Sequence, residues 1–577
     1  MEPISKENPV SGANALIRAL LEEGVDTVFG YPGGTILPVY DALYDWQDQL
    51  RHILVRHEQG ATHAAEGYAR ATGKVGVVIV TSGPGAANVI TGLSDAMMDS
   101  TPLVVITGQV GAQYLGSDAF QETDVIGITQ PITKWSIQVR KPEEINDAVA
   151  RAFFIARSGR PGPVVIDISK DAQTGMVTTP FKPINFIRSY NPTPHPDEEK
   201  IRAAATMINE AERPMILAGQ GVAISGAEEL LREFAEKTQI PVASTLLGLS
   251  VMPSDHPLYK GMLGIHGNIG PNVATNRADV LIGIGMRFDD RVTGDASKYA
   301  PDAKIIHIDI DAMEFDKVVA STIAVHGDAS ETLGKLLPLV DSHERRDEWM
   351  SLFDRCDARE REAVLEPELG RKGDAPMTIG EVAAAISRAA GHEAIAVTDV
   401  GQNQMMSARY FRFKSPRSFI SSGGLGTMGF GLPAAIGARI GRPDRTVVCM
   451  MGDGGFQMTM QELGTIMQYG VGVKMVILNN NFLGNVRQWQ QLFFHRRFSQ
   501  TPMINPDFME ISHAYGIPSC QVTERAGLEP AIRRMLDHDG PFLMEVAIDP
   551  TDMVFPMVPP GAPVSHLMLN PDTVFEP

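Results

Sequence analysis

Polar side chains follow two apolar segments in the stretch from Met451 to Asn481, MGDGGFQMTMQELGTIMQYGVGVKMVILNNN. Asp453 stands between glycines after the first apolar segment, and three asparagines, Asn479–Asn481, end the second. Asn is a poor strand former and a buried amide needs hydrogen-bond partners, so three adjacent amides indicate a polar site. Carboxylate and amide oxygens, with phosphate oxygens and water, suit Mg²⁺ better than Zn²⁺.

The elements around these residues predict how they meet. Residues 445–451 read as a strand, 458–470 as a helix and 473–478 as the next strand. In a parallel βαβ unit both strands end at the same edge of the sheet, where α/β proteins bind ligands. The pattern therefore predicts a Mg²⁺–diphosphate site at that edge. The glycines that let backbone N–H groups approach a phosphate are Gly452, Gly454 and Gly455.

The composition narrows the class of protein. The chain has 577 residues, of which 44% are hydrophobic, and this length exceeds one hydrophobic core. A formal net charge of −19 argues against a large nucleic-acid interface. The three cysteines are far apart, which excludes a disulfide framework and a zinc site. We find no signal peptide, transit peptide or apolar run long enough for a membrane, and expect a cytoplasmic protein or a mature form without its presequence.

Short Val/Ile-rich runs that end in Gly, Asp or Asn alternate with amphipathic helices along the whole chain. This alternation predicts an α/β fold with buried parallel strands. Two irregular stretches, Thr178–Lys200 and Glu366–Thr378, read as linkers and divide the chain into residues 1–185, 186–372 and 373–577. The first and third parts share one order of elements, which predicts one unit used twice; chance similarity between βαβ units is the alternative.

The GDG segment and the paired asparagines, one strand–helix–strand unit apart, resemble the diphosphate-binding motif of thiamine diphosphate (ThDP) enzymes. The resemblance implies that Mg²⁺ is bound by Asp453, Asn480 and the backbone oxygen of Phe482. Residues 53–88, ILVRHEQGATHAAEGYARATGKVGVVIVTSGPGAAN, resemble the pyrimidine-binding domain of the same enzymes. The matching glutamate is Glu58, which would favour the imino tautomer of the cofactor by a contact with ring atom N1′. A solvated glutamate in a charged loop is the alternative.

Nearly the whole chain is similar to the catalytic subunit of acetohydroxyacid synthase (acetolactate synthase). FDDRVTG together with RQWQ separates this family from other ThDP enzymes better than the general motif does. The matching segments are residues 29–43 (FGYPGGTILPVYDAL), 117–129 (SDAFQETDVIGIT), 285–294 (GMRFDDRVTG), 421–438 (SSGGLGTMGFGLPAAIGA), 486–494 (VRQWQQLFF) and 554–563 (VFPMVPPGAP).

The resemblance implies a fold and a reaction. Two doubly wound ThDP-binding domains, for pyrimidine and for diphosphate, would flank a Rossmann-like FAD-binding middle domain. The ThDP carbanion would attack pyruvate, CO₂ would leave, and the hydroxyethyl carbanion would pass to a second pyruvate or to 2-oxobutanoate. The products, 2-acetolactate and 2-aceto-2-hydroxybutanoate, serve valine, leucine and isoleucine biosynthesis. The family's sites lie between two chains, so we expect a homodimer or homotetramer, with a regulatory small subunit as a possible further partner.

Five residues match groups that the family places around the reacting carbons. Arg291 would grip the acceptor carboxylate in a bidentate manner, which Lys cannot do, although a surface Asp–Arg pair is the alternative. Trp489 would favour the larger acceptor by apolar contact, unless it is a core aromatic. Gln121, next to Phe120, would come from the neighbouring chain. Met428 would hold ThDP bent, although a buried Met is most often plain core.

The remaining matches concern cofactor binding. Gly426 would contact the 4′-amino group of ThDP through its backbone, and Gln404 the diphosphate. FAD would have a structural role, because the reaction involves no net oxidation or reduction. The residues that fall where the family contacts FAD are Gly219, Thr245, Leu246, Leu263, Gly264, His266, Gly285, Arg287, Asp289, Arg291, Asp309, Ile310 and Asp328.

Four positions depart from the usual family pattern: Asn485, Asn403, Met406 and Ile265 stand where Met, His, Trp and Met are common. They put acceptor preference in doubt rather than the class of reaction. Other ThDP enzymes remain as alternatives: pyruvate oxidase, a catabolic acetolactate synthase without FAD, or glyoxylate carboligase, which lacks the cofactor glutamate. A non-enzymatic binding role is a further alternative.

Overall fold

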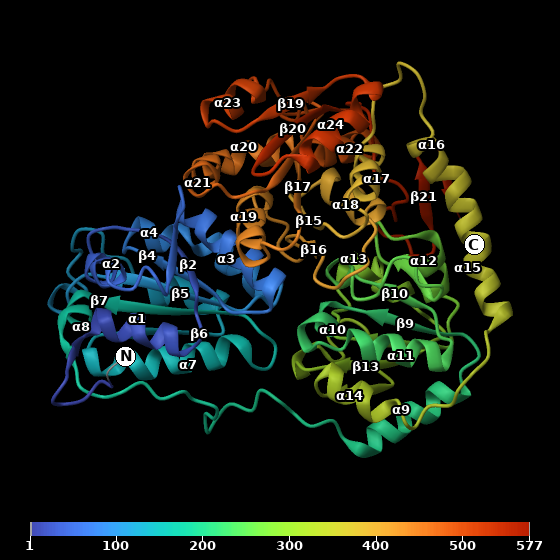
Figure 1. Cartoon of the computed structure of the whole chain (residues 1–577). Coiled ribbons are helices and arrows are strands. Elements are labelled where there is room, and N and C mark those ends of the chain that lie inside the picture. Colours follow the sequence, from blue (N-terminus) through green and yellow to red (C-terminus); the bar gives the residue numbers. More distant parts are fainter. Residues whose placement is uncertain (1–2, 576–577) are drawn as a thin grey trace.

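A computed structural model describes residues 3–575 and contains three six-stranded parallel sheets, one in each predicted part of the chain (Figure 1). The first and third sheets have the same strand order, 2-1-3-4-6-5, when each is counted from its own first strand. The expectation of one unit used twice is therefore confirmed. In sheet order the strands of the first sheet are β3 (Arg51–Leu54), β2 (Thr27–Tyr31), β4 (Gly76–Val80), β5 (Leu103–Gln109), β7 (Pro163–Ser169) and β6 (Trp135–Val139). Those of the third are β16 (Phe419–Ile420), β15 (Ile395–Thr398), β17 (Val447–Gly452), β18 (Lys474–Asn479), β20 (Phe542–Ala547) and β19 (Ser519–Val522).

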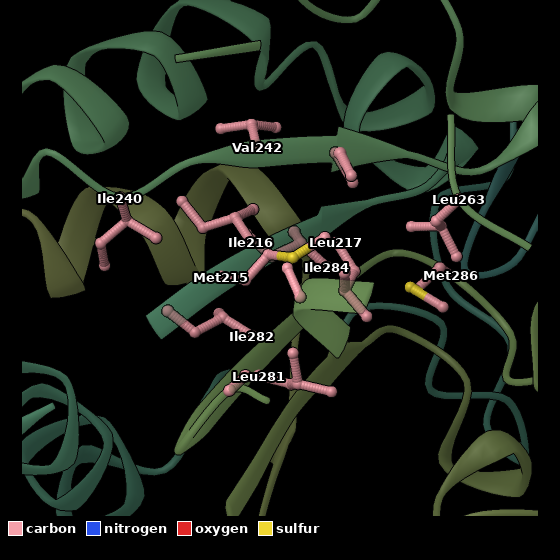
Figure 2. Close-up of a cluster of buried hydrophobic side chains, with 14 of the residues drawn as sticks. Met215, Ile216, Leu217, Ile240, Val242, Leu263, Leu281, Ile282, Ile284 and Met286 are labelled. Atoms are coloured by element: carbon pink, nitrogen blue, oxygen red, sulfur yellow. The ribbon is translucent and has the colours of Figure 1, made fainter. Parts of the chain in front are cut away.

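The middle sheet has a different order, 3-2-1-4-5-6, which is that of dinucleotide-binding folds. Its order reverses between β9 and β12, and the carboxyl ends of these two strands are where such folds bind ligands. Figure 2 shows Ile216 of β9 and Ile282 of β12 among the buried side chains of this core. In sheet order the strands are β11 (Tyr259–Met262), β10 (Val242–Ser244), β9 (Pro214–Ala218), β12 (Val280–Ile284), β13 (Lys304–Asp309) and β14 (Ile323–His326).

Helices lie on both faces of each sheet (Figure 1). In β4, Val77 and Ile79 pack into one hydrophobic cluster and Val78 and Val80 into another, because successive side chains of a strand point to opposite faces. This accounts for the continuous apolar runs in the sequence. The helices of the first part are α1 (Gly12–Glu22), α2 (Leu37–Tyr44), α3 (Glu58–Thr72), α4 (Pro84–Asn88), α5 (Ile90–Met98), α6 (Val125–Thr129), α7 (Ile145–Arg157) and α8 (Lys170–Thr174). Those of the middle part are α9 (Glu198–Glu210), α10 (Gln220–Ser225), α11 (Glu228–Thr238), α12 (Ile269–Thr275), α13 (Asp290–Thr293), α14 (Ala329–Leu336), α15 (Asp347–Glu360) and α16 (Glu366–Leu369). Those of the third part are α17 (Ile379–Ala389), α18 (Gln402–Tyr410), α19 (Gly431–Gly441), α20 (Asp453–Thr459), α21 (Leu463–Tyr469), α22 (Gly484–Phe493), α23 (Phe508–Ala514) and α24 (Leu528–Asp537).

No helix within residues 3–575 is long and apolar enough to cross a membrane.

The structure differs from the sequence-based division in three segments. Glu198–Lys200, the end of the first stretch interpreted as linker, forms the first turn of α9, so that interpretation is wrong for these three residues. Glu366–Leu369 forms α16, so the interpretation of these four residues as linker is wrong. The C-terminal segment returns to the middle part, where Phe555, Met557 and Leu567 join the core and the Val558 N–H donates to the carbonyl oxygen of Ile265 at 2.8 Å. It ends in the hairpin β21 (Leu567–Asn570) and β22 (Thr573–Phe575). The domain boundaries after residues 185 and 372 stay predictions.

The first and third parts meet through α3 and α19, the equivalent helices of the repeated unit. A Cβ atom on Gly67 of α3 would overlap the carbonyl oxygen of Ala434, and one on Gly437 of α19 would overlap that of Ala64. The two contacts are reciprocal, and both require glycine because the obstacle is backbone rather than a flexible side chain. The repeated units therefore pack backbone to backbone, which fixes the position of α3 against the third part.

We expect Gly437→Ala to destabilise the protein by about 3 kcal/mol, the upper end of the usual cost of overpacking a core. The measurement is the first transition in thermal unfolding, followed by circular dichroism. Gly334→Ala is the matched control, because a Cβ at this helical position in α14 would meet no atom within 4 Å. The control should leave the transition unchanged or raise it. Equal transition temperatures for Gly437→Ala and Gly334→Ala would contradict the close contact between α3 and α19.

Candidate active site

The acid and the amides meet at one edge of the third sheet, as the sequence predicted. β17 and β18 are parallel, and Gly452 lies opposite Leu478, so Asp453 and Asn479 follow side by side. Asp453 is buried at the start of α20; its Oδ1 accepts from the Gly454 N–H, and its Oδ2 accepts from Asn505 Nδ2 at 2.7 Å. Burial raises the pKa of Asp453 above its usual value, against the lowering effect of these donors. Asn505 also donates to Asn479 Oδ1 at 2.9 Å, and sequence reasoning missed this residue.

The three asparagines have three different environments. Asn479 donates to Glu545 Oε1 at 2.7 Å and thus ties β18 to β20. Asn480 is buried; its Oδ1 accepts from the Phe482 N–H at 3.0 Å, and its Nδ2 donates to Gln402 Oε1 at 3.4 Å. Asn481 is exposed with φ +58°, a left-handed conformation that Asn tolerates. The turn therefore carries the oxygens of Asn480 and Phe482 directly after β18, the strand beside β17, which Asp453 follows.

These oxygens are suitable ligands for Mg²⁺. A carboxylate, a side-chain amide oxygen and a backbone carbonyl are all hard donors, and they leave positions for phosphate oxygens and water. Arg487 packs between the rings of Phe482 and Phe498, with its guanidinium carbon 5.1 and 5.0 Å from their centroids. The turn that carries Phe482 is therefore held against the 494–503 segment by cation–π contacts.

Three residues expected to contact ThDP are Met428, Gln404 and Gly426. The Cε atom of Met428 lies 3.7 Å from the Cβ position of Gly454. Gln404 on α18 is buried, and its Nε2 donates to Ser421 Oγ at 2.6 Å and to the carbonyl oxygen of Ser422 at 2.8 Å. Gly426 is exposed with φ +70°, where a side chain would be strained. The side-chain oxygen of Asn403 is buried without a hydrogen-bond partner, which suits a polar ligand nearby.

A cavity of about 840 Å³ is lined by residues of all three parts, most of them from the middle and third parts. The third part contributes Gln404, Gly426 and Trp489 to its wall. Two glycines of the expected FAD set, Gly219 and Gly264, lie behind the wall, where a Cβ would meet the backbone of Gly285 and Arg291. The other residues that the resemblance assigns to FAD line it: Thr245, Leu246, Leu263, His266, Gly285, Arg287, Asp289, Arg291, Asp309, Ile310 and Asp328.

Charged groups gather at the middle-domain end of this cavity. Burial raises the pKa of Asp309 to about 7, and the Asp311 and Glu314 carboxylates add to this, whereas Arg160 opposes it. Arg160 comes from the loop before β7 and reaches Asp311 Oδ2 at 3.1 Å and Glu314 Oε1 at 2.7 Å. This loop of the first part closes the cavity, and sequence reasoning did not find it.

The two residues expected to bind the acceptor lie in the same cavity. Arg291 on α13 has a side chain that is 68% exposed, with a single loose ion pair to Asp290 Oδ2 at 3.6 Å. Trp489 on α22 lies one helical turn after Asn485, which also lines the cavity. Asn485 makes no side-chain hydrogen bond within the described chain, and its Oδ1 is buried. Of the other departures from the family pattern, Ile265 lines the cavity, whereas Met406 is buried in the core of the third part.

The expected residues of the first part form a separate group. Glu58 begins α3, and its Oε2 accepts from Asn88 Nδ2 at 2.9 Å. Gln121 has φ +61° and lies against Gly83, while the neighbouring Phe120 is 88% exposed. Neither Glu58 nor Gln121 lines the cavity, and neither do Asp453, Asn480 and Met428. The contacts of Glu58 and Gln121 given above are made with residues of their own part.

Comparisons with known proteins find a matching family for each of the three parts. Residues 10–128 match the family described as thiamine pyrophosphate enzyme, N-terminal TPP binding domain. Residues 201–336 match the central domain of these enzymes, and residues 399–546 match their C-terminal TPP binding domain.

Full-length relatives are also found. The acetolactate synthase large subunit of Lactococcus lactis is 44% identical over 97% of this chain and 96% of its own length. The acetolactate synthase isozyme 2 large subunit of Escherichia coli is 45% identical over 97% of this chain and 99% of its own. The mitochondrial acetolactate synthase catalytic subunit of Saccharomyces cerevisiae is 41% identical over 96% of this chain and 83% of its own.

Proposed function

We propose that this chain, which belongs to the family of acetolactate synthase large subunits, decarboxylates pyruvate and joins the remaining two-carbon unit to a second 2-oxo acid. The acceptors are pyruvate, which gives 2-acetolactate, and 2-oxobutanoate, which gives 2-aceto-2-hydroxybutanoate. The observation that carries the proposal is a single cavity in which Arg291 and Trp489 meet Gln404 and Gly426 of the ThDP-binding unit. Product analysis after incubation with both 2-oxo acids tests it.

When bound, thiamine diphosphate supplies the carbanion for this reaction. The chain's own residues hold and orient it. Asp453, Asn480 and the backbone oxygen of Phe482 are proposed to bind Mg²⁺, and the N–H groups of Gly454 and Gly455 to approach the diphosphate. Gln404, Gly426 and Met428 are proposed to fix its conformation, and Glu58 to exchange a proton at ring atom N1′.

The acceptor is a small anion, and two residues of the cavity are proposed to select it. The exposed guanidinium of Arg291 can bind the carboxylate in a bidentate manner. Trp489 offers an apolar face to the extra methylene of 2-oxobutanoate. FAD is proposed to occupy the middle-domain end of the same cavity in a structural role, because the reaction needs no net electron transfer. Reduction of the flavin by pyruvate would instead favour pyruvate oxidase.

Trp489→Leu is expected to lower the preference for 2-oxobutanoate over pyruvate by about 10-fold, because one methylene contact is worth about 1–3 kcal/mol. Acetolactate formation should persist. The measurement is the ratio of the two acetohydroxy acids formed in competition. Phe494→Leu is the control, since Phe494 is 58% exposed near the end of the same helix and does not line the cavity. An unaltered ratio in Trp489→Leu would count against the selective role.

The contacts of Glu58 with Asn88 and of Gln121 with Gly83, all within the first part, support a dimer in which another chain supplies the diphosphate side of each site. The exposed Phe120 beside Gln121 is an apolar group suited to such an interface. Dimer and dimer of dimers both satisfy this arrangement. The printed names of the relatives, as large subunits, also support a regulatory small subunit as a partner.

Complementation between variants tests the shared site. We expect the Glu58→Gln and Asp453→Ala homodimers to have little activity. Mixed dimers, isolated by co-expression with two affinity tags, should regain activity, because one of their two sites combines an intact Glu58 with an intact Asp453. If both residues served the same site from one chain, every site in the mixed dimer would carry a substitution. Mixed dimers as inactive as their parents would therefore contradict the shared site.

A further inference from the structure

We propose that Asn88 is a positioning residue for Glu58, which sets the orientation of its carboxylate for proton transfer with the cofactor ring. Asn88 ends α4, and its Nδ2 donates to Glu58 Oε2 at 2.9 Å. Within residues 3–575, this is the only hydrogen bond of the Glu58 side chain. Because Oε2 is engaged, Oε1 is the oxygen left to face N1′ of the aminopyrimidine. The inference rests on the proposed function, since it concerns the same proton transfer.

The turn that carries Asn88 is held close to Glu58 by its neighbours. A Cβ on Gly85 would lie 2.8 Å from Thr81 Cγ2 and 3.4 Å from Glu58 Oε1, so the backbone of α4 passes directly beside the carboxylate. Thr81 contacts Thr35 through their hydroxyl oxygens at 3.0 Å. Thr35 Oγ1 also accepts from the Ser82 N–H at 3.1 Å. Asn88 thus projects from an anchored turn, which makes its amide a fixed donor.

The same turn also positions the second expected residue of this group. Gly83, the residue before α4, has φ +58° and lies against Gln121, so that a Cβ there would come within 2.9 Å of Gln121 Cβ. The six residues from Gly83 to Asn88 therefore contact Gln121 at one end and Glu58 at the other. The conformation of this turn bears on the positions of both Glu58 and Gln121.

The physical need for such a residue follows from the carboxylate itself. A carboxylate that is free to rotate offers either oxygen in many directions, whereas proton transfer requires one oxygen at hydrogen-bonding distance and aligned. Hydrogen bonds to an ionised group are stronger than neutral ones, so one amide donor can hold this orientation. A small misplacement of a reacting group costs about 10²-fold in rate. Loss of the Asn88 donor should therefore slow proton transfer without removing the base.

The test measures hydrogen–deuterium exchange at C2 of ThDP in the holoenzyme without pyruvate, by quenched flow and NMR. Asn88→Asp has nearly the same shape but replaces the donor by an acceptor, and Asn88→Ala removes it. We expect both variants to exchange more slowly than wild type, by about 10- to 100-fold, the usual scale for a hydrogen bond to a charged group. Glu58→Gln should be slower than either.

The pH dependence separates positioning from a general structural defect. As the pH falls, the carboxyl pair in Asn88→Asp takes up a proton and regains an O–H donor between the two side chains. Its deficit relative to wild type should therefore shrink at low pH, whereas the deficit of Asn88→Ala should not. Asn146→Asp is the control: Asn146 donates to the carbonyl oxygen of Thr179 at 2.8 Å elsewhere in the first part, and this variant should exchange at the wild-type rate.

Wild-type exchange rates in both Asn88 variants would overturn the inference, and so would a deficit in Asn88→Asp that does not change with pH. Different outcomes test the proposed function and the role of Asn88. If wild type forms acetolactate and Glu58→Gln slows exchange while the Asn88 variants do not, only the role of Asn88 is wrong. If exchange in wild type does not depend on Glu58, the proposed roles of Glu58 and Asn88 are both wrong, whereas a wild type that forms no acetolactate would overturn the proposed function.

Discussion

Glu58→Gln should slow acetolactate formation by roughly 10²–10⁴-fold, the usual contribution of a general acid–base group. Glutamine keeps the length of the side chain and can still accept a hydrogen bond from Asn88, but it cannot exchange a proton with the cofactor ring. The loss should appear in kcat rather than in KM for pyruvate, because the substrate is bound by other residues. The measurement is a steady-state assay with saturating ThDP and Mg²⁺.

Glu143→Gln is the control for this substitution, since Glu143 is exposed in the first turn of the helical segment before α7. It should retain wild-type turnover. A Glu58→Gln variant with wild-type kcat would exclude Glu58 from proton transfer, and with it the proposed position of the aminopyrimidine.

Asp453→Ala should abolish Mg²⁺-dependent binding of ThDP. The substitution removes the only carboxylate among the three proposed ligands, and with it the acceptor that Asn505 Nδ2 meets at 2.7 Å, while the Asn505–Asn479 bond remains. Two neutral oxygens, from Asn480 and Phe482, bind a divalent ion much more weakly than a set that contains an anion. The loss should therefore be in cofactor affinity, which calorimetric titration of apoprotein with ThDP at fixed Mg²⁺ measures.

Asp444→Ala is the control, because Asp444 is exposed and pairs with Arg442 on the surface of the same part. Its cofactor titration should match wild type. Titration of Asp453→Ala with an unchanged midpoint and unchanged dependence on Mg²⁺ would refute the ligand role. Activity alone would not distinguish these outcomes, since a poorly bound cofactor and a badly oriented one both slow turnover.

Much of this architecture could be predicted because strands, helices and turns leave their patterns in short stretches of sequence. The run ending at Gly452 and the run ending at Asn479 are apolar on both faces, which is the property of a central parallel strand. One crossover helix between them suffices to bring their carboxyl ends together, so the meeting of Asp453 and Asn479 follows from topology alone. The order of elements also predicted that the first and third parts share one unit, whereas the strand order within that unit comes from the structure.

The features that sequence reasoning missed depend on distant contacts. Asn505 reaches Asp453 from an irregular segment, and Arg160 reaches Asp311 from a loop of another part of the chain. Neither contact has a periodic pattern that could reveal it. The return of Phe555–Leu569 to the middle core is of the same kind, because its apolar residues indicate burial but not the partner. Glu366–Leu369 was misread because Gly and Pro nearby outweighed a helical turn that continues from α15.

The most direct test is to incubate the purified protein with pyruvate, 2-oxobutanoate, Mg²⁺, ThDP and FAD, and to quantify CO₂ and both acetohydroxy acids. The account predicts release of one CO₂ for each acetohydroxy acid formed, with both products present and no net reduction of the flavin. Release of CO₂ with acetate or acetyl phosphate and reduced flavin, or no CO₂ at all, would contradict it.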